Sequence, residues 1–286
     1  AVIGNDRIYI LVDEDTKLYF KDRVPDDVLV VADVEDIWMR DFTTVNPHAP
    51  VQFRYTPASF DDDQYEADLV QESFTTFLTA HDIDVPKTEY FIDGGNIVDN
   101  YHGRIVTTTR FLEDNNLTKE EGVAELKRLL GATEVAILPP DDEVLAHSDG
   151  MVMFTDTDTI LVNQYDEPFR SEVRGELKRA FPGIKIVEIE AAFEDEQWDG
   201  VIGSACGINV NSTVTTNYIY MPHFADRVSD TALEIIQANT TKKVIPVPAK
   251  NVCRMGGSVR CLTWQQSSVQ AKEVIEKITT NNTYGS

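Results

Sequence analysis

Cysteines and long apolar runs are scarce in this chain of 286 residues, and each scarcity excludes a class of protein. The three cysteines are too few for a scaffold held together by disulfides. Cys206 and Cys253 can pair and leave Cys261 free, but the sequence does not decide this. No apolar run approaches the roughly 20 residues of a membrane-spanning helix. We therefore expect a globular protein without a membrane partner.

Basic residues are also scarce. Lys and Arg number 25 against 49 Asp and Glu, which gives a net charge of −24. A surface of this sign repels nucleic acid and attracts a cationic ligand. The alternative is that the charge serves solubility alone. We expect a cationic ligand and no nucleic-acid partner, while the oligomeric state is left open.

Hydrophobic residues make up 42% of the chain, enough for a sizeable core. No linker or low-complexity tract interrupts the sequence, so we expect one domain over residues 1–286. Asn-x-Ser/Thr sequons slightly favour secretion over a cytoplasmic location. They begin at Asn116, Asn211, Asn239 and Asn281.

Apolar residues with helical spacing alternate along the chain with short β-branched runs. Helices are predicted around residues 69–78, 123–130, 169–181, 233–236 and 269–278. Strands are predicted at 8–12, 28–31, 135–138, 151–154, 160–162, 184–189 and 244–247. The order strand, loop, two strands, helix recurs five times at roughly 50–60 residues, which indicates a closed or stacked repeat architecture.

Each predicted unit carries a polar loop at the same place, after its first strand. These loops are residues 36–41, 93–96, 147–150, 206–211 and 256–261. If the units close into a ring, the loops meet at one centre. That centre would hold Asp41, Asp93, His147, Asp149, Asn211 and Cys261.

Cys261 follows two glycines at a predicted loop–strand junction. Taken alone it would more often be an inert buried thiol. Carboxylates near a cysteine raise the thiol pKa and oppose the thiolate. The conflict is resolved if the substrate is a guanidinium cation held between Asp41 and Asp149. Cys261 would then attack the guanidinium carbon, and His147 would serve as acid and base. Such chemistry needs no metal and no cofactor.

Four motifs, in order along nearly the whole chain, resemble those of the Porphyromonas-type peptidylarginine deiminases and the agmatine deiminases. They are Trp38-Met39-Arg40-Asp41, Asp93-Gly94-Gly95-Asn96, His147-Ser148-Asp149, and Gly256-Gly257 with Cys261. The resemblance implies an α/β fold, the five-bladed pseudo-symmetric propeller of ββαβ units called a pentein.

The resemblance also assigns roles to residues of this chain. It implies Cys261 as nucleophile, His147 as acid and base, Asp41 and Asp149 as guanidinium ligands, and Trp38 as part of the pocket lining. Agmatine deiminases usually carry Glu where Asp93 stands, to orient the histidine, and members often have His at the position of Arg260.

Three residues bear on the substrate. Asn211 looks like the substrate-contacting Asn of the peptidylarginine branch. We expect Asp93 to contact the substrate as well. Arg54 lies where that branch places arginines that bind a carboxylate; the alternative is a surface arginine paired with the acidic run at 61–63. We therefore expect conversion of peptidyl-arginine to peptidyl-citrulline and ammonia.

Other functions remain compatible with the same residues. The first alternative is deimination of agmatine to N-carbamoylputrescine. A second is transfer of the amidino group to an amine in place of water. A third, from a different class, is a non-catalytic acidic protein that binds polyamines or cationic peptides.

Overall fold

The computed structural model describes residues 2–60, 62–141, 145–193, 197–198, 202–267 and 269–281. Within these ranges the α-helices are α1 Lys17–Phe20, α2 Met39–Phe42, α3 Gln64–Ala80, α4 Arg110–Asp114, α5 Lys119–Leu130, α6 Phe169–Ala180, α7 Arg227–Ala238 and α8 Val269–Asn281. The short 3₁₀ helices are η1 Asp26–Val28, η2 Gly94–Asn96, η3 Ser148–Gly150 and η4 Val252–Met255.

Four three-stranded sheets share one topology, with a central strand antiparallel to the first strand and parallel to the third. They are β3 Thr44–Val45, β4 Val51–Arg54 and β5 Lys87–Phe91; β6 Val98–Asp99, β7 Arg104–Thr108 and β8 Glu134–Leu138; β9 Val152–Asp156, β10 Thr159–Asn163 and β11 Lys185–Ile189; and β14 Thr213–Val214, β15 Tyr218–His223 and β16 Lys243–Pro248. In each sheet, one or two helices connect the second strand to the third, as a parallel pair requires.

Two smaller sheets complete the described strands. β1 Ile10–Val12 pairs in parallel with β2 Leu29–Val31, and β12 Gln197–Trp198 pairs with β13 Ile202–Gly203. The predicted helices correspond to α3, α5, α6, α7 and α8, and the predicted strands are confirmed within one or two residues at each end.

The expected order of strand, loop, two strands and helix is found four times, but the fifth occurrence is wrong. After the loop at 256–261 the chain passes to α8 without a strand in the described residues 256–267. The segment after Cys261 instead uses its polar side chains on neighbouring loops: Trp264 Nε1 donates to Thr44 Oγ1 at 2.8 Å. Those contacts replace the hairpin that the repeat pattern predicted.

Local sequence explains the clearest helix boundaries. Thr118 and Glu121 form a capping box at the start of α5, since each side chain accepts a hydrogen bond from the other residue's backbone N–H. The helix stops at Gly131, which adopts a left-handed conformation with φ of 67°. Asp63 and Asp226 accept backbone hydrogen bonds at the starts of α3 and α7.

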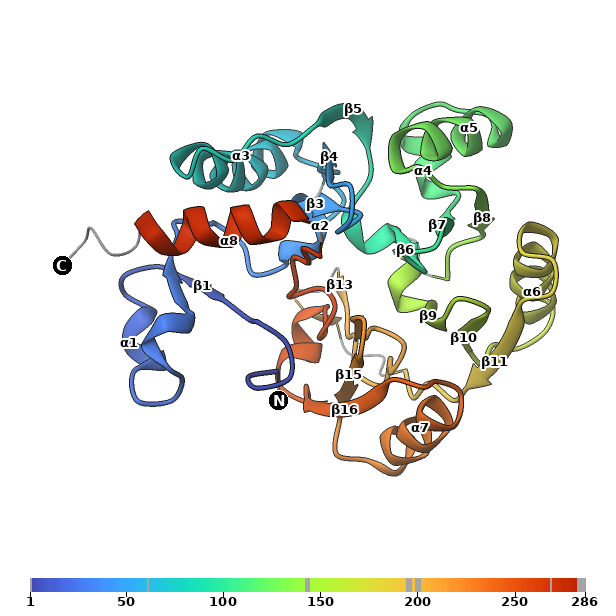
Figure 1. Cartoon of the computed structure of the whole chain (residues 1–286). Helices are drawn as coiled ribbons and strands as arrows, with labels where there is room; N and C mark the ends of the chain where they lie inside the picture. Colours follow the sequence, from blue (N-terminus) through green and yellow to red (C-terminus); the bar gives the residue numbers. More distant parts are fainter. Residues whose placement is uncertain are drawn as a thin grey trace.

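The helices α3, α5, α6 and α7 lie on the outside of the sheets, and the loops that carry the polar motifs lie toward the middle of the molecule (Figure 1). α8 runs beside α3, although the two are far apart in sequence (Figure 1). There Ile278, 3% exposed, packs in one apolar cluster with Val70 and Phe77 of α3. None of the helices in the described ranges is long and apolar enough to cross a membrane.

Candidate active site

The five polar loops predicted from the sequence meet in one place. The backbone N–H of Arg40 donates to the carbonyl of Cys261 at 2.9 Å, which joins the first loop to the last. The first loop also reaches the second, and the second reaches the third, through the side chains described below. Because the loops are tied to one another by hydrogen bonds, their side chains are held around a common centre.

His147 is held by Asp93. The imidazole Nε2 lies 3.0 Å from Oδ2 of Asp93, and both side chains are buried or nearly so. Asp93 is itself fixed by Thr56, which donates to it from its backbone N at 2.9 Å and from its hydroxyl at 2.8 Å. Asp93 was expected among the substrate contacts; the structure places it against the histidine instead.

Asp41 lies on the other side of the imidazole. Its Oδ1 accepts a hydrogen bond from the backbone N–H of Gly95 at 2.8 Å and lies 3.8 Å from Nδ1 of His147. A Cβ at residue 95 would come within 2.5 Å of that Nδ1 and within 2.7 Å of Asp41 Oδ1. Gly95 is therefore required for Asp41 and His147 to approach the same backbone segment.

Cys261 is a free thiol that is 8% exposed. Its Sγ lies 3.3 Å from Nδ2 and 3.4 Å from Oδ1 of Asn211. The same Nδ2 is 3.4 Å from the carbonyl of Asp149, so Asn211 joins the cysteine loop to the loop of η3. Asn211 is 3% exposed, and its sequon is buried.

Asp149, on η3, is paired with a residue to which the sequence analysis gave no role. Oδ2 of Asp149 lies 2.8 Å from Nη1 of Arg260, and the two side chains are 2% and 11% exposed. Sequence reasoning registered Arg260 only as a departure from a family pattern. An arginine next to the candidate cysteine in an acidic chain was the signal that could have identified this ion pair.

Trp38, the residue before α2, packs its ring against Gly257. A Cβ at residue 257 would lie 2.3 Å from Cζ3 of the indole. The indole can therefore lie against the cysteine loop only because residue 257 has no side chain. Trp38 itself is half-buried.

The electrostatics of the cluster oppose a thiolate at Cys261. Burial, followed by the charges of Asp149 and Asp41, raises the pKa of the Cys261 thiol well above its usual value. Burial alone would lower the pKa of His147, but Asp41, Asp93 and Asp149 raise it to about 10. Burial, with Asp93 and Asp149, raises the pKa of Asp41 to about 7. The pKa shifts of Cys261 and His147 therefore both favour the protonated form of the group.

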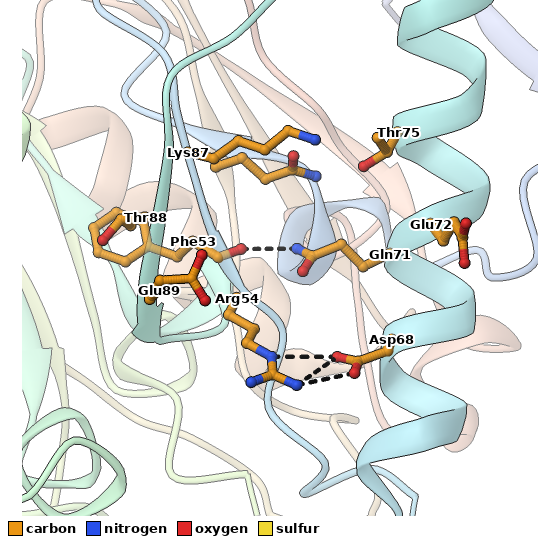
Figure 2. A pocket seen from close by; sticks show the side chains of 10 residues that line it. Phe53, Arg54, Asp68, Gln71, Glu72, Thr75, Lys87, Thr88 and Glu89 are labelled. Atoms are coloured by element: carbon orange, nitrogen blue, oxygen red, sulfur yellow. Dashed lines mark hydrogen bonds and ion pairs between the residues drawn. The ribbon is translucent and has the colours of Figure 1, made fainter.

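Arg54 does not join this cluster. Its guanidinium pairs with Asp68 of α3, with 2.9 Å between Nη2 and Oδ2 (Figure 2). The same guanidinium lies over the ring of Phe91, 4.8 Å from the ring centroid. It borders a separate cavity of about 280 Å³ between α3, β4 and β5. The sequence suggested an acidic partner at 61–63; the partner found is Asp68, and Asp61 lies outside the described residues. The pairing with Asp68 leaves the expected carboxylate-binding role without structural support.

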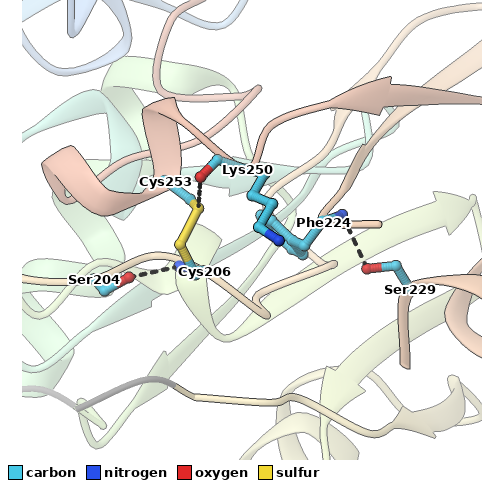
Figure 3. The surroundings of a disulfide bond; sticks show 6 residues. All are labelled: Ser204, Cys206, Phe224, Ser229, Lys250 and Cys253. Carbon is cyan, nitrogen blue, oxygen red and sulfur yellow. Dashed lines mark hydrogen bonds between the residues drawn. A yellow bond between two sulfur atoms is a disulfide. The ribbon is translucent and has the colours of Figure 1, made fainter. Parts of the chain in front are cut away.

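A disulfide joins Cys206 to Cys253 and leaves Cys261 free, the arrangement that the sequence left open (Figure 3). Cys206 lies five positions before Asn211, and Cys253 lies on η4 just before the cysteine loop. The bond therefore ties together the two loops whose side chains meet at Sγ of Cys261.

Comparison with known proteins is consistent with this site. A family model described as Porphyromonas-type peptidyl-arginine deiminase matches residues 1–267. The agmatine deiminases of Pseudomonas fluorescens and Pseudomonas syringae pv. tomato are each 26% identical over 64% and 62% of this chain. The matched regions cover 59% and 57% of those proteins, so the chain spans less than two thirds of their length.

Solved structures share the fold at low identity. The C. jejuni agmatine deiminase aligns with 91% of this chain and 82% of its own, with a TM-score of 0.75 and 18% identity. The agmatine deiminase of Enterococcus faecalis aligns with 91% and 83%, with a TM-score of 0.74 and 17% identity. The α/β fold is that of these proteins.

Proposed function

The chain belongs to the Porphyromonas-type peptidyl-arginine deiminase family, and we propose that it hydrolyses a C–N bond of a guanidinium substrate, with agmatine as the first candidate. The observation that carries the proposal is the position of a free thiol within one buried cluster of His147 and carboxylates. Asn211, in contact with the sulfur, belongs to the same cluster.

A cationic substrate makes the electrostatics of the cluster productive. Burial, Asp149 and Asp41 oppose ionisation of Cys261. A bound guanidinium is permanently charged and offers several N–H donors to carboxylates. Its charge would offset Asp41 and Asp149 and favour the thiolate at the moment when the substrate carbon is in place. A neutral amide substrate would bring no such charge.

The chemistry proceeds through a covalent intermediate. Once the guanidinium is bound, the thiol of Cys261 loses its proton to solvent and the resulting thiolate attacks the guanidinium carbon. The imidazolium of His147 then gives its proton to one nitrogen of the adduct, the C–N bond breaks, and ammonia leaves. An amidino-thioether remains on the sulfur. The neutral imidazole then takes a proton from water, the oxygen attacks the same carbon, and the C–S bond breaks. The hydroxyl proton of the adduct passes to solvent as the C=O bond forms, a ureido product is released, and the thiolate and the imidazolium are restored.

Asp93 orients the acid and base in this scheme. Its carboxylate contacts Nε2 of His147 and is fixed by Thr56, so it is committed to the imidazole. Nδ1 is then the nitrogen that faces Asp41. In the proposed roles, Asp41 and Asp149 bind the guanidinium and Trp38 lines the pocket.

Agmatine fits the observations better than the peptidyl-arginine favoured by the sequence analysis. The two Pseudomonas relatives are both named agmatine deiminase. Arginine in a peptide presents carbonyl or carboxylate groups, and Arg54, the arginine expected to bind them, is paired with Asp68. Agmatine has no carboxylate and carries two positive charges, which suits a chain of net charge −24.

Ammonia release and product mass decide the substrate. Agmatine, free arginine, a peptide ending in arginine and a peptide with internal arginine are each incubated with the protein and with Cys261→Ala. We expect ammonia and N-carbamoylputrescine from agmatine with the wild type alone. Addition of an amine acceptor tests amidino transfer, since that reaction yields a guanidinylated amine.

Failure to convert any of these compounds would contradict the proposed function. Undiminished binding of agmatine or spermidine, without turnover, would favour the acidic binding protein. Isothermal titration of both cations into wild type and Cys261→Ala measures this binding. A binding protein binds them equally with and without the thiol and releases no ammonia in either case.

We also propose that the sheets close into five blades. Four sheets of the same strand order support this, as do the five loops that are joined by hydrogen bonds around Cys261. The β1–β2 pair would belong to the fifth blade. An experimental structure with the blades in a ring around the cysteine would test the proposal.

A further inference from the structure

Arg260, the residue immediately before the nucleophile, extends its side chain into the protein and not into solvent. Its Nη1 lies 2.8 Å from Oδ2 of Asp149 and 3.4 Å from the carbonyl of Gly94, and Nη2 donates to the carbonyl of Ile97. The side chain is 11% exposed. One guanidinium therefore links the cysteine loop to η3 and to the segment of η2.

The backbone of Arg260 makes a second set of contacts beside the sulfur. Its N–H lies 3.2 Å from the carbonyl of Asn211 and 3.1 Å from Oδ1 of the same residue. Asn211 in turn contacts Sγ of Cys261. The backbone of Arg260 thus fixes Asn211, which contacts the sulfur, and its side chain fixes Asp149, whose charge acts on the thiol.

The ion pair determines which atoms of Asp149 remain available. Oδ2 is engaged by Arg260, while in the described part of the chain Oδ1 accepts no hydrogen bond. Asp41 has a similar arrangement, with Oδ1 engaged by Gly95. Each of the two proposed guanidinium ligands is therefore anchored through one oxygen and can offer the other.

We propose that Arg260 is a positioning residue for the deimination reaction, holding Asp149 so that a single carboxylate oxygen is presented to the guanidinium and offsetting its charge beside Cys261. This inference rests on the proposed function. Arginine suits the task because its planar fork reaches a carboxylate and two carbonyls at once and keeps its charge when buried. Lysine would supply the charge without the fork.

The other charged groups around Arg260 do not replace it. Asp99, Tyr101 and Arg40 also interact electrostatically with Arg260; Arg40 is buried, whereas Asp99 and Tyr101 are half-buried. Asp99 is flanked by both arginines, so its charge is shared with Arg40. On the side of the sulfur, Asp149 and Asp41 are the charges that face Cys261. Removal of Arg260 consequently leaves Asp149 as an uncompensated carboxylate next to the thiol.

The test compares Arg260→Gln and Arg260→Lys with the wild type in two measurements. The first is the rate of alkylation of Cys261 by iodoacetamide as a function of pH, followed by mass spectrometry. We expect Arg260→Gln to move the alkylation midpoint upward by about one pH unit or more, because an unpaired carboxylate then faces the thiol. Arg260→Lys keeps a cation near Asp149 and should stay close to the wild-type midpoint.

The second measurement is kcat/KM for agmatine. Misplacement of Asp149 should lower it on the order of 100-fold in Arg260→Gln, and by a smaller factor in Arg260→Lys. Arg104→Gln is the matched control: Arg104 is 15% exposed and pairs with Glu134 on β8. It should alter neither the alkylation midpoint nor kcat/KM, although it too loses a part-buried ion pair.

An Arg260→Gln protein that is folded by circular dichroism and alkylates with the wild-type midpoint would overturn the inference. If that variant does not fold, Arg260→Lys carries the test, and wild-type kcat/KM in Arg260→Lys overturns it. Alkylation needs no substrate. A wild type that converts no guanidino compound would therefore refute the proposed function, while the alkylation midpoints would still decide what Arg260 does to Asp149 and Cys261.

Discussion

The imidazole Nε2 of His147 lies 3.0 Å from Oδ2 of Asp93, so a carboxylate one methylene shorter than glutamate reaches the ring directly. The backbone of η2 makes this possible, because Asp93 directly precedes that helix and Thr56 fixes both of its oxygens. Asp93 can therefore make the contact with the histidine that the longer glutamate is expected to make in agmatine deiminases.

Asp93→Asn should lower kcat for guanidinium hydrolysis on the order of 100-fold. The amide keeps the shape of the carboxylate but removes a negative charge that helps to raise the pKa of His147. We therefore also expect the imidazole to titrate at lower pH, which NMR of the histidine ring would detect. Asp68→Asn, which removes the partner of Arg54, is the control and should leave both quantities unchanged. An unchanged histidine titration in Asp93→Asn would contradict the assignment.

The helices and the inward loops could be predicted because their signals are local. Apolar spacing located α3, α5, α6 and α7. Asp41, Asp93, His147, Asp149, Asn211 and Cys261 were grouped by their common place in each repeat, and hydrogen bonds join their loops.

The partners of buried charges could not be predicted, since they depend on contacts distant in sequence. Arg260 and Asp149 are 111 positions apart, and Asp93 and Thr56 are 37 apart. Arg54 was assigned by analogy of position, and its partner Asp68 lies one helix further along the chain. The missing fifth hairpin has a similar cause, because Trp264 hydrogen-bonds to Thr44, 220 positions earlier, where the repeat predicted a strand.

Gly95→Ala should reduce kcat by at least about 10-fold while the protein remains folded. The new methyl group would lie 2.5 Å from Nδ1 of His147 and 2.7 Å from Oδ1 of Asp41, so one of these side chains must move. Overpacking of this kind costs about 1–3 kcal/mol of stability. Gly175→Ala on α6 is the matched control, because its Cβ meets nothing within 4 Å and alanine favours a helix. Equal kcat for both variants would contradict the proposed arrangement.

Replacement of both Cys206 and Cys253 by alanine should lower the free energy of unfolding by about 4 kcal/mol, the chain-entropy value for a loop closed over 47 residues. Urea unfolding of the variant and the wild type measures this change. The loops that carry Asn211 and Cys261 also lose their covalent link, so kcat should fall while the thiol of Cys261 remains. A variant with the wild-type urea midpoint would show that the disulfide contributes nothing to stability.

The protonation of His147 makes stability depend on pH in a defined direction. Burial opposes the charge, but Asp41, Asp93 and Asp149 raise the histidine pKa from its ordinary 6.5 to about 10 in the folded protein. Between these values the folded state binds a proton that the unfolded state has released. The free energy of unfolding therefore includes a contribution that is fully present below pH 6.5 and is lost as the pH rises through 10.

His147→Gln should remove this contribution, so its free energy of unfolding should fall less steeply than that of the wild type between pH 7 and pH 9. One proton accounts for at most about 1.4 kcal/mol per pH unit. Urea unfolding at pH 7, 8 and 9 gives the two slopes. His223→Gln is the control, because His223 pairs with Asp230 away from the cysteine and should retain the wild-type slope. Parallel slopes for His147→Gln and the wild type would mean that His147 does not hold its proton in the folded state, and the acid step assigned to it would lose its donor.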